Sequence, residues 1–184
     1  MRLYLICVIF LAACASPDNY YLLSAKKAPP TVQSAAPQVS IGVGPVLIPD
    51  YIDCPEMVFQ SGPNKFEIPG SERWAGSLKS AMTKVIATNL SRGLSTSEVR
   101  TYPWEPGAKL RYSVAIDVTQ FHAQTGGDAV LDATWRIYDE ETNRITIQRH
   151  SVLTRPLDTD GYEAVVEAES LLLMDLSDAI ARAL

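Results

Sequence analysis

Apolar residues recur with the period of an α-helix in two segments of the chain. Beyond Ser71, a residue suited to cap a helix, apolar side chains fall three or four residues apart as far as Gly93, where a helix would end. The second segment opens at residues 158–160 and runs to about Leu184, with its apolar side chains in an arc of about 120°. We therefore predict two amphipathic helices, each with one apolar side that packs on a sheet.

Alternating apolar and polar residues predict the strands. Three alternating segments, 110–118, 131–137 and 145–147, are separated by turn-forming residues and predict a three-strand antiparallel meander. Shorter apolar runs predict strands at residues 20–23, 39–48 and 99–102, and a hairpin within 57–68. The predicted fold class is α+β: a two-layer sandwich with a mainly antiparallel sheet and both amphipathic helices packed on it.

Three residues of the second predicted helix break its pattern. Glu169 lies inside the apolar arc, where a carboxylate needs a basic partner or a place at the edge of the core. Leu171 and Met174 project from the opposite, polar side. Either a loop covers these two side chains or they belong to an interface, so we treat them as candidate contacts with a partner or a second copy.

Trp104 is a further candidate contact, in a loop between two predicted strands. Pro103 precedes it, and Glu105 and Pro106 follow it, so the loop is stiff. Tryptophan is enriched among the residues that dominate binding energy at interfaces. Trp104 therefore either presents its ring to a partner or caps the core of its own domain.

The start of the chain has the features of a secretory signal. Residues 1–13 hold Arg2, no acidic residue and an apolar run shorter than the about 20 residues needed to span a membrane. Leu11-Ala12-Ala13-Cys14 resembles the lipobox of bacterial lipoproteins, in which the chain is cut before the cysteine and the thiol is acylated. The alternative is an ordinary secretory signal cleaved after Ala13.

We therefore predict cleavage between Ala13 and Cys14 and a covalent lipid on Cys14. The remaining residues, 14–184, are enough for a single domain with its own core. Within them, residues 25–38 are rich in Ala, Lys, Pro, Ser and Gln and have no apolar period, so we expect a linker or a long loop.

Charge and cysteine content narrow the class of protein further. The formal net charge is −5 at pH 7, and the loss of Arg2 with the signal makes the mature chain more negative. With no basic cluster longer than Lys26-Lys27, nucleic acid is a poor candidate partner. Because Cys7 leaves with the signal and Cys14 is acylated, Cys54 has no partner for an internal disulfide; it is either a small apolar filler or a reactive thiol.

Residues for catalysis or metal binding are not arranged in any recognisable motif. His122 and His150 have no cysteine or carboxylate at metal-ligand spacing, and the chain lacks a nucleophile elbow and a phosphate loop. Residues 42–44, Gly-Val-Gly, are followed by Pro45 and an extended stretch instead of a helix, which excludes a dinucleotide fingerprint. We expect no catalytic residue, no metal site and no cofactor apart from the lipid on Cys14.

Several segments together resemble the PqiC-type lipoproteins, the auxiliary components of ABC-type and MCE-type intermembrane transport systems. These segments are YYLL (20–23) after the lipobox, IGVGPVLIPDYIDCPEMV (41–58), RWAGSL (73–78), YPW (102–104) and LSDAIARAL (176–184). The resemblance implies an outer-membrane lipoprotein of the periplasm that works with an MCE tunnel protein and an inner-membrane subunit to move lipids, without catalysis. Ala15 agrees with the outer membrane, because an aspartate there would favour retention in the inner membrane.

On this resemblance we expect a module that docks the tunnel protein at the outer membrane. An alternative is a carrier whose own cavity holds an acyl chain, and another class would be an envelope hydrolase. We also expect the domain to self-associate, as a closed ring with head-to-tail contacts that match the symmetry of the tunnel.

Replacing the acylated cysteine tests the lipid anchor. We expect Cys14→Ser to abolish acylation and release the protein from the membrane, because acyl chains contribute about 0.8 kcal/mol per buried methylene and the domain has no substitute for them. Membrane sedimentation of the wild type, the variant and a Ser16→Ala control measures this, and globomycin should make the wild type accumulate as precursor. A Cys14→Ser protein that still sediments with the outer membrane contradicts the anchor.

Overall fold

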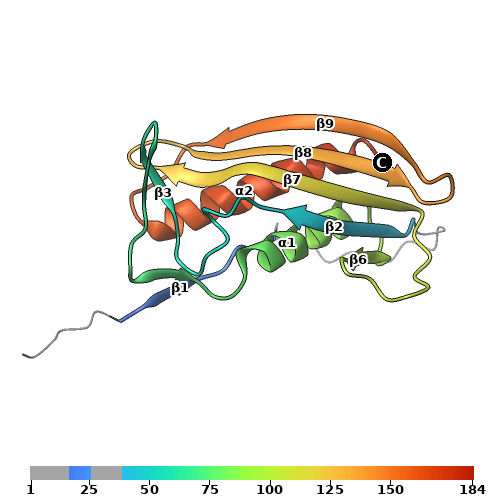
Figure 1. The fold of residues 1–184 in the computed structure, drawn as a ribbon, viewed down its shortest axis with the longest axis horizontal. Coiled ribbons are helices and arrows are strands. Elements are labelled where there is room, and N and C mark those ends of the chain that lie inside the picture. Colours follow the sequence, from blue (N-terminus) through green and yellow to red (C-terminus); the bar gives the residue numbers. More distant parts are fainter. Residues whose placement is uncertain (1–16, 26–38) are drawn as a thin grey trace, which may run out of the picture.

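The computed structural model describes residues 17–25 and 39–184 (Figure 1). One face of a seven-stranded sheet is covered by two helices, which pack side by side. The α+β class with two helices is therefore confirmed. The helices are α1 (Leu78–Gly93) and α2 (Tyr162–Ala181), and the strands of the large sheet are β2 (Ile41–Leu47), β3 (Phe59–Gly62), β4 (Lys65–Glu67), β6 (Val99–Thr101), β7 (Tyr112–Gln124), β8 (Ala129–Asp139) and β9 (Arg144–Arg155).

The long strands have one buried face, as their alternating pattern predicts. In β8, Leu131, Ala133, Trp135 and Ile137 are all buried in the core, whereas the residues between them lie on the other face. The Trp135 indole N–H donates to Ser151 Oγ at 3.0 Å, so its polar group is satisfied inside the core. β7, β8 and β9 follow one another as antiparallel neighbours.

The sheet is mixed: its longest pairings, β7–β8 and β8–β9, are antiparallel, but it also contains parallel pairs that the sequence pattern does not predict. β2 pairs in parallel with β6 on one edge and with β7 on the other, and β3 pairs in parallel with the end of β7. α1 returns the chain along the helix-covered face before β6, and residues 102–111 then connect β6 to β7 across the strand between them. Alternation along a sequence predicts which side of a strand is buried but not the direction of its neighbours.

The first helix begins later than the sequence pattern predicts. Its N-cap is Ser77 and not Ser71: the Ser77 Oγ accepts a hydrogen bond from the backbone N–H of Ser80 at 3.3 Å. The residues assigned to the first helical turn instead form β5 (Glu72–Trp74), which pairs in parallel with β1 (Asn19–Tyr21) in a separate two-stranded sheet. On its other side, the Trp74 N–H donates to Pro55 O at 2.8 Å, so tertiary pairing overrides the local helical period.

The second helix begins at Tyr162, after Gly161 at the N-cap, and contains one buried acid. Glu169 is 2% exposed, and its Oε2 accepts no hydrogen bond from the described residues. Within the same residues it has no ion pair, so the structure does not provide the basic partner expected there. Burial raises the pKa of Glu169 to about 8, so the side chain is largely protonated in the folded protein at pH 7.

The buried acid predicts a pH-dependent stability. Because the folded pKa is about 8 against an ordinary 4.5, the folded state holds a proton that the unfolded state releases between these values. The free energy of unfolding should therefore fall as pH rises from 4.5 to 8, by up to about 1.4 kcal/mol per pH unit from this group.

Denaturant unfolding across this pH range measures the effect. Glu169→Gln should flatten the slope, whereas Glu167→Gln, on the exposed side of the same helix, should leave it unchanged. Equal slopes in the wild type and Glu169→Gln would show that Glu169 titrates normally.

Candidate functional site

The N-terminal strand is fastened to the domain through one buried carboxylate. Glu72 in β5 is 5% exposed and accepts hydrogen bonds from the Tyr21 hydroxyl (2.7 Å), the Asn19 side-chain amide (3.1 Å) and the Ser71 hydroxyl (2.9 Å). The hydrogen bond from Tyr21, with those from Asn19 and Ser71, holds the pKa of Glu72 below its usual value. Burial and this carboxylate together raise the pKa of the Tyr21 hydroxyl. We call β1 the anchor strand, because it connects the domain to the segment that contains Cys14.

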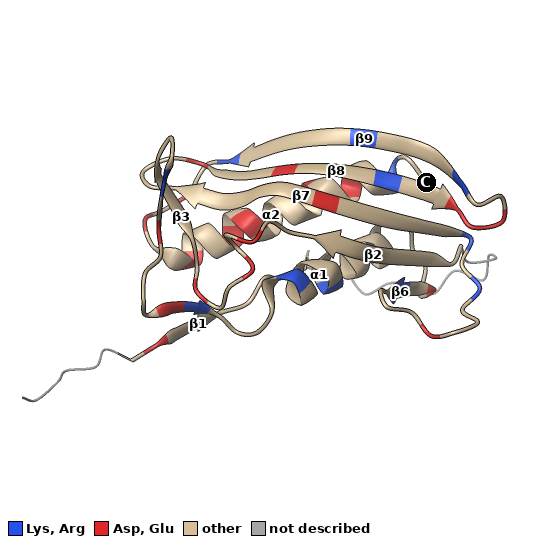
Figure 2. Ribbon diagram, in the orientation of Figure 1, with Lys and Arg blue, Asp and Glu red and all other residues tan. Residues whose placement is uncertain are grey.

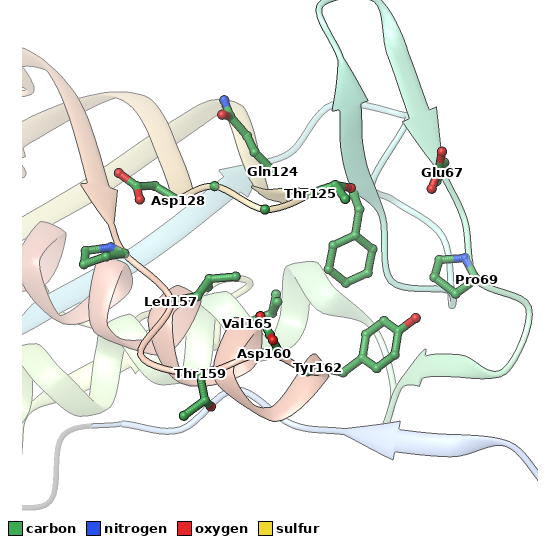
Figure 3. A pocket seen from close by; sticks show the side chains of 15 residues that line it. Glu67, Pro69, Gln124, Thr125, Asp128, Leu157, Thr159, Asp160, Tyr162 and Val165 are labelled. Carbon is green, nitrogen blue, oxygen red and sulfur yellow. The ribbon is translucent and has the colours of Figure 1, made fainter.

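A pocket of about 580 Å³ lies at this end of the molecule (Figure 3). It is formed where the β3–β4 hairpin, the turn between β7 and β8, and the start of α2 meet. The Phe59 and Tyr162 rings form one wall in edge contact, with centroids 5.4 Å apart and planes at 73°. Figure 3 shows Tyr162 and Pro69 on one side of the pocket, Leu157 and Asp128 on the other, and Val165 between them.

The charge of this pocket is entirely acidic. Its lining includes Glu67, Asp128 and Asp160, all exposed at the rim, and contains no lysine, arginine or histidine. Glu67 is paired with Lys65 at 2.8 Å, which lowers the pKa of Glu67. Among the described residues, Asp128 and Asp160 form no ion pair. The site therefore combines a buried apolar residue, Val165, with a rim on which the carboxylates of Asp128 and Asp160 are not neutralised.

A second feature lies on the face of the sheet opposite the helices. The Trp104 ring packs against β2 at Gly42, where an added Cβ would be 2.8 Å from the indole and 2.6 Å from Leu110. Tyr102 packs in the same way against Gly44, where an added Cβ would be 2.5 Å from the tyrosine Cβ. The two glycines therefore allow residues 102–111 to cross β2 in close contact, which gives them a role in packing.

Tyr102 also connects Trp104 to a groove of about 420 Å³ beside α1. The two rings are in edge contact at 5.3 Å, and the groove is lined by Tyr102, Leu47, Lys79 and Lys84, among others. Tyr102 and Leu47 are each 53% exposed. Figure 2 shows basic residues of α1 beneath β2. We call Tyr102, Leu47, Lys79 and Lys84 the basic groove; Trp104 lies beside it, in contact with Tyr102.

Leu171 and Met174 are half-buried on the outer side of α2. Leu171 contacts a small cavity that is also lined by Arg155 and Pro156, at the end of β9. Arg155 binds Asp175 through two hydrogen bonds of 2.8 Å, which fasten this end of β9 to α2. The Leu171 side chain is therefore partly covered by other residues of the same domain.

The candidate residues do not form one surface. Trp104 lies on the open face of the sheet at β2, whereas Leu171 and Met174 lie on a helix packed against the other face. Ala13 and Cys14 lie outside the described residues, so cleavage and acylation stay predictions.

Cys54 and His122 both pack inside the domain, which gives them structural roles. Burial raises the pKa of the Cys54 thiol, which packs against the core with its Sγ 3.5 Å from Glu56 O.

His122 is 2% exposed, and its two ring nitrogens contact the Tyr51 hydroxyl (3.0 Å) and Gln60 Oε1 (3.2 Å). Burial lowers the pKa of His122, so this imidazole is neutral at pH 7 and joins the loop after β2 to β3 and β7. In the described part of the chain, no three His, Cys, Asp or Glu side chains are grouped to hold a metal ion.

The residues of the acidic pocket carry no signal in the sequence pattern. In the sequence pattern, Asp160 is assigned only to the start of a helix and Asp128 only to a turn. Phe59 is one member of a short apolar run. Glu72 falls within a predicted helical period. Only the pairing of distant segments brings these side chains together.

Comparisons with known proteins identify related chains. The model of the family described as the ABC-type transport auxiliary lipoprotein component matches residues 21–181. The intermembrane transport lipoprotein PqiC of Escherichia coli is 26% identical over 171 residues, covering 88% of this chain and 85% of the relative. PqiC of Shigella flexneri matches with the same identity and coverage.

Solved structures share the fold. A crystal structure of an uncharacterised protein superposes with a TM-score of 0.74 at 22% identity, covering 91% of this chain and 99% of the other. A protein from Xanthomonas campestris superposes with a TM-score of 0.70 at 16% identity, covering 89% and 92%. Within the described residues, neither helix is both long and apolar enough to pass through a bilayer.

Proposed function

This chain belongs to the family of ABC-type transport auxiliary lipoprotein components, and on that premise we propose that it docks an MCE-type tunnel protein at the outer membrane. In this role it is a lipid-anchored periplasmic subunit of an intermembrane lipid transport system that also contains an inner-membrane subunit. The observation that carries the proposal is the match to a family of transport auxiliary lipoproteins, which spans nearly all of the predicted mature chain. Since this is not an enzyme family, the role requires no catalytic residue.

The anchor strand supports a position close to the membrane. Cys14 lies five residues before Asn19, which is held by its backbone hydrogen bond to Ser71 O at 2.8 Å. Five residues extend at most about 18 Å, so a lipid on Cys14 would keep β1 near the bilayer surface. The start of α2 lies at the same end of the molecule as β1 (Figure 1), and its residues Gly161 and Tyr162 line the acidic pocket.

The basic groove is the surface that we assign to the tunnel protein. It combines the properties of a protein interface: exposed aromatic and aliphatic side chains at Tyr102 and Leu47, and charged side chains at their margin. Lys79 is neutralised by Asp53 at 3.1 Å, so Lys84 supplies most of the free positive charge. The partner surface should therefore be apolar with an acidic margin.

A filled core favours docking over the alternative of a carrier with its own acyl-chain cavity. Trp135, Phe121, Leu172 and Leu173 are all almost completely buried between the sheet and the helices. A carrier would need space at this position to hold an acyl chain.

One variant in the basic groove and one at Trp104, next to it, test the docking role. The acylated protein should co-purify with the tunnel protein, and we expect Trp104→Ala and Lys84→Glu each to weaken capture about tenfold, which is about 1.4 kcal/mol. Lys84 is exposed, so its variant should melt like the wild type. Tyr20→Ala, a change of an exposed aromatic residue at the anchor end, is the matched control.

The melting temperatures separate recognition from packing. Lost capture by Lys84→Glu with unchanged melting supports docking through the groove. If Trp104→Ala only lowers the melting temperature and Lys84→Glu is captured normally, the groove is not the docking surface.

Self-association into a closed ring is the second part of the proposal. The partly covered Leu171 and Met174 would lie at a head-to-tail contact between copies, the contact type that closes rings. Light scattering on the mature chain carrying Cys14→Ser should give an oligomer, and Leu171→Lys and Met174→Lys should each dissociate it. A monomeric parent protein would exclude the ring, and an oligomer that tolerates both substitutions would exclude this interface.

A further inference from the structure

The acidic pocket at the anchor end has no part in docking through the basic groove. Its wall is the edge-to-face pair of Phe59 and Tyr162, its floor includes buried Val165, and its rim carries the carboxylates of Asp128 and Asp160. A pocket with an aromatic wall and with rim carboxylates that no basic residue neutralises is a typical environment for an organic cation. An anionic group would meet the negative rim without a basic side chain of the lining to receive it.

The size of the pocket limits the ligand to a small group. A volume of about 580 Å³ lies in the range of small-molecule sites, which is about 300 to 1,000 Å³. The apolar side chains of Leu157, Pro156 and Pro69 extend the lining beyond the aromatic wall, so the ligand should carry an apolar part next to its charge. An alkylammonium group that continues into an amphiphile meets both requirements.

The position of the pocket indicates where this ligand comes from. Tyr162, in the aromatic wall, also contacts Tyr21, the last residue of the anchor strand, with ring centroids 6.2 Å apart. Tyr21 in turn donates to Glu72, which fastens β1 to the domain. The pocket is thus one side-chain contact from the strand that a lipid on Cys14 would hold at the bilayer.

We propose that the acidic pocket binds the ammonium headgroup of a zwitterionic phospholipid at the membrane surface. The proposal rests on the lipid-transport role described above and adds the class of lipid that the domain contacts. The ammonium group lies against the Phe59 and Tyr162 rings and between the rim carboxylates, while the glycerol end contacts the apolar lining. Anionic phospholipids are excluded by the same carboxylates.

Titration with soluble short-chain lipids tests the site. The mature chain with Cys14→Ser, labelled with ¹⁵N, is titrated below the micellar concentration with dihexanoylphosphatidylethanolamine, dihexanoylphosphatidylglycerol or free ethanolamine. We expect saturable shifts of the amides of residues 126–128 and 160–162 with the first lipid, and at least about tenfold weaker binding of the other two probes. Equal binding of the glycerol lipid would overturn the headgroup assignment, and equal binding of free ethanolamine would overturn the lipid as its source.

Variants of the rim distinguish this site from general adsorption. The double variant Asp128→Asn and Asp160→Asn keeps the size of both side chains and should weaken phosphatidylethanolamine binding about tenfold. Glu105→Gln, an exposed acid in the loop before β7, should leave binding unchanged. Unaltered binding in the double variant, or an equal loss in Glu105→Gln, would overturn the proposal.

The test of headgroup binding and the test of tunnel docking can fail independently of each other. Headgroup binding without tunnel capture would contradict docking and leave this site in place. Tunnel capture without headgroup binding would remove only the site.

Discussion

The parallel alignment of β2 with both of its neighbours constrains most of this domain. Because β6 and β7 run in the same direction as β2 on its two edges, the chain must return along one face of the sheet and cross the other. α1 makes the return on the core side, and residues 102–111 cross the open side. The crossing requires that β2 have no side chains where Tyr102 and Trp104 pack on it, and Gly42 and Gly44 meet this requirement. As a result of these two connections, Tyr102 and the lysines of α1 line the same groove, and Trp104 packs next to Tyr102.

A second constraint acts at the end of the molecule where β1 lies. There the Glu72 carboxylate holds together segments that are far apart in the sequence. Glu72 accepts hydrogen bonds from Asn19, Tyr21 and Ser71, so its burial is compensated by donors from β1 and from the residue that precedes β5. Without these donors, a carboxylate at this depth would carry a large desolvation cost. Tyr21, placed by Glu72, supports Tyr162 at the start of α2 and hence the aromatic wall of the acidic pocket. The surfaces that we assign to the protein partner and to the lipid thus depend on different contacts.

The sequence pattern predicts the elements that follow a single local rule. The alternation of Leu131, Ala133, Trp135 and Ile137 identifies the buried face of β8, and the helical period from Tyr162 identifies α2. Prediction fails where a distant partner decides the local structure: β5 is extended because β1 and residues 55–57 pair with it, although its residues continue a helical period. The parallel pairs and the acidic pocket are hidden for the same reason, since Phe59, Asp128 and Tyr162 come from segments that only the complete topology brings together. Of the candidate contacts, the sequence draws attention to Trp104 through its prolines but contains no sign of the glycines on which its ring lies.

The attachment of β1 also determines how the domain responds to a mechanical load. A pull along the N-terminal tail acts on Asn19 in the direction of the strand, and β1 and β5 are parallel neighbours. The hydrogen bonds from Asn19 N to Ser71 O and from Ala75 N to Tyr21 O, both 2.8 Å, are therefore loaded together in shear instead of being opened one after another. The side-chain hydrogen bonds of Glu72 share the same load, and β5 passes it through a short connection to the capped start of α1. Tension on the N-terminal tail would thus reach the helical layer through β5, without first loading the long strands of the sheet.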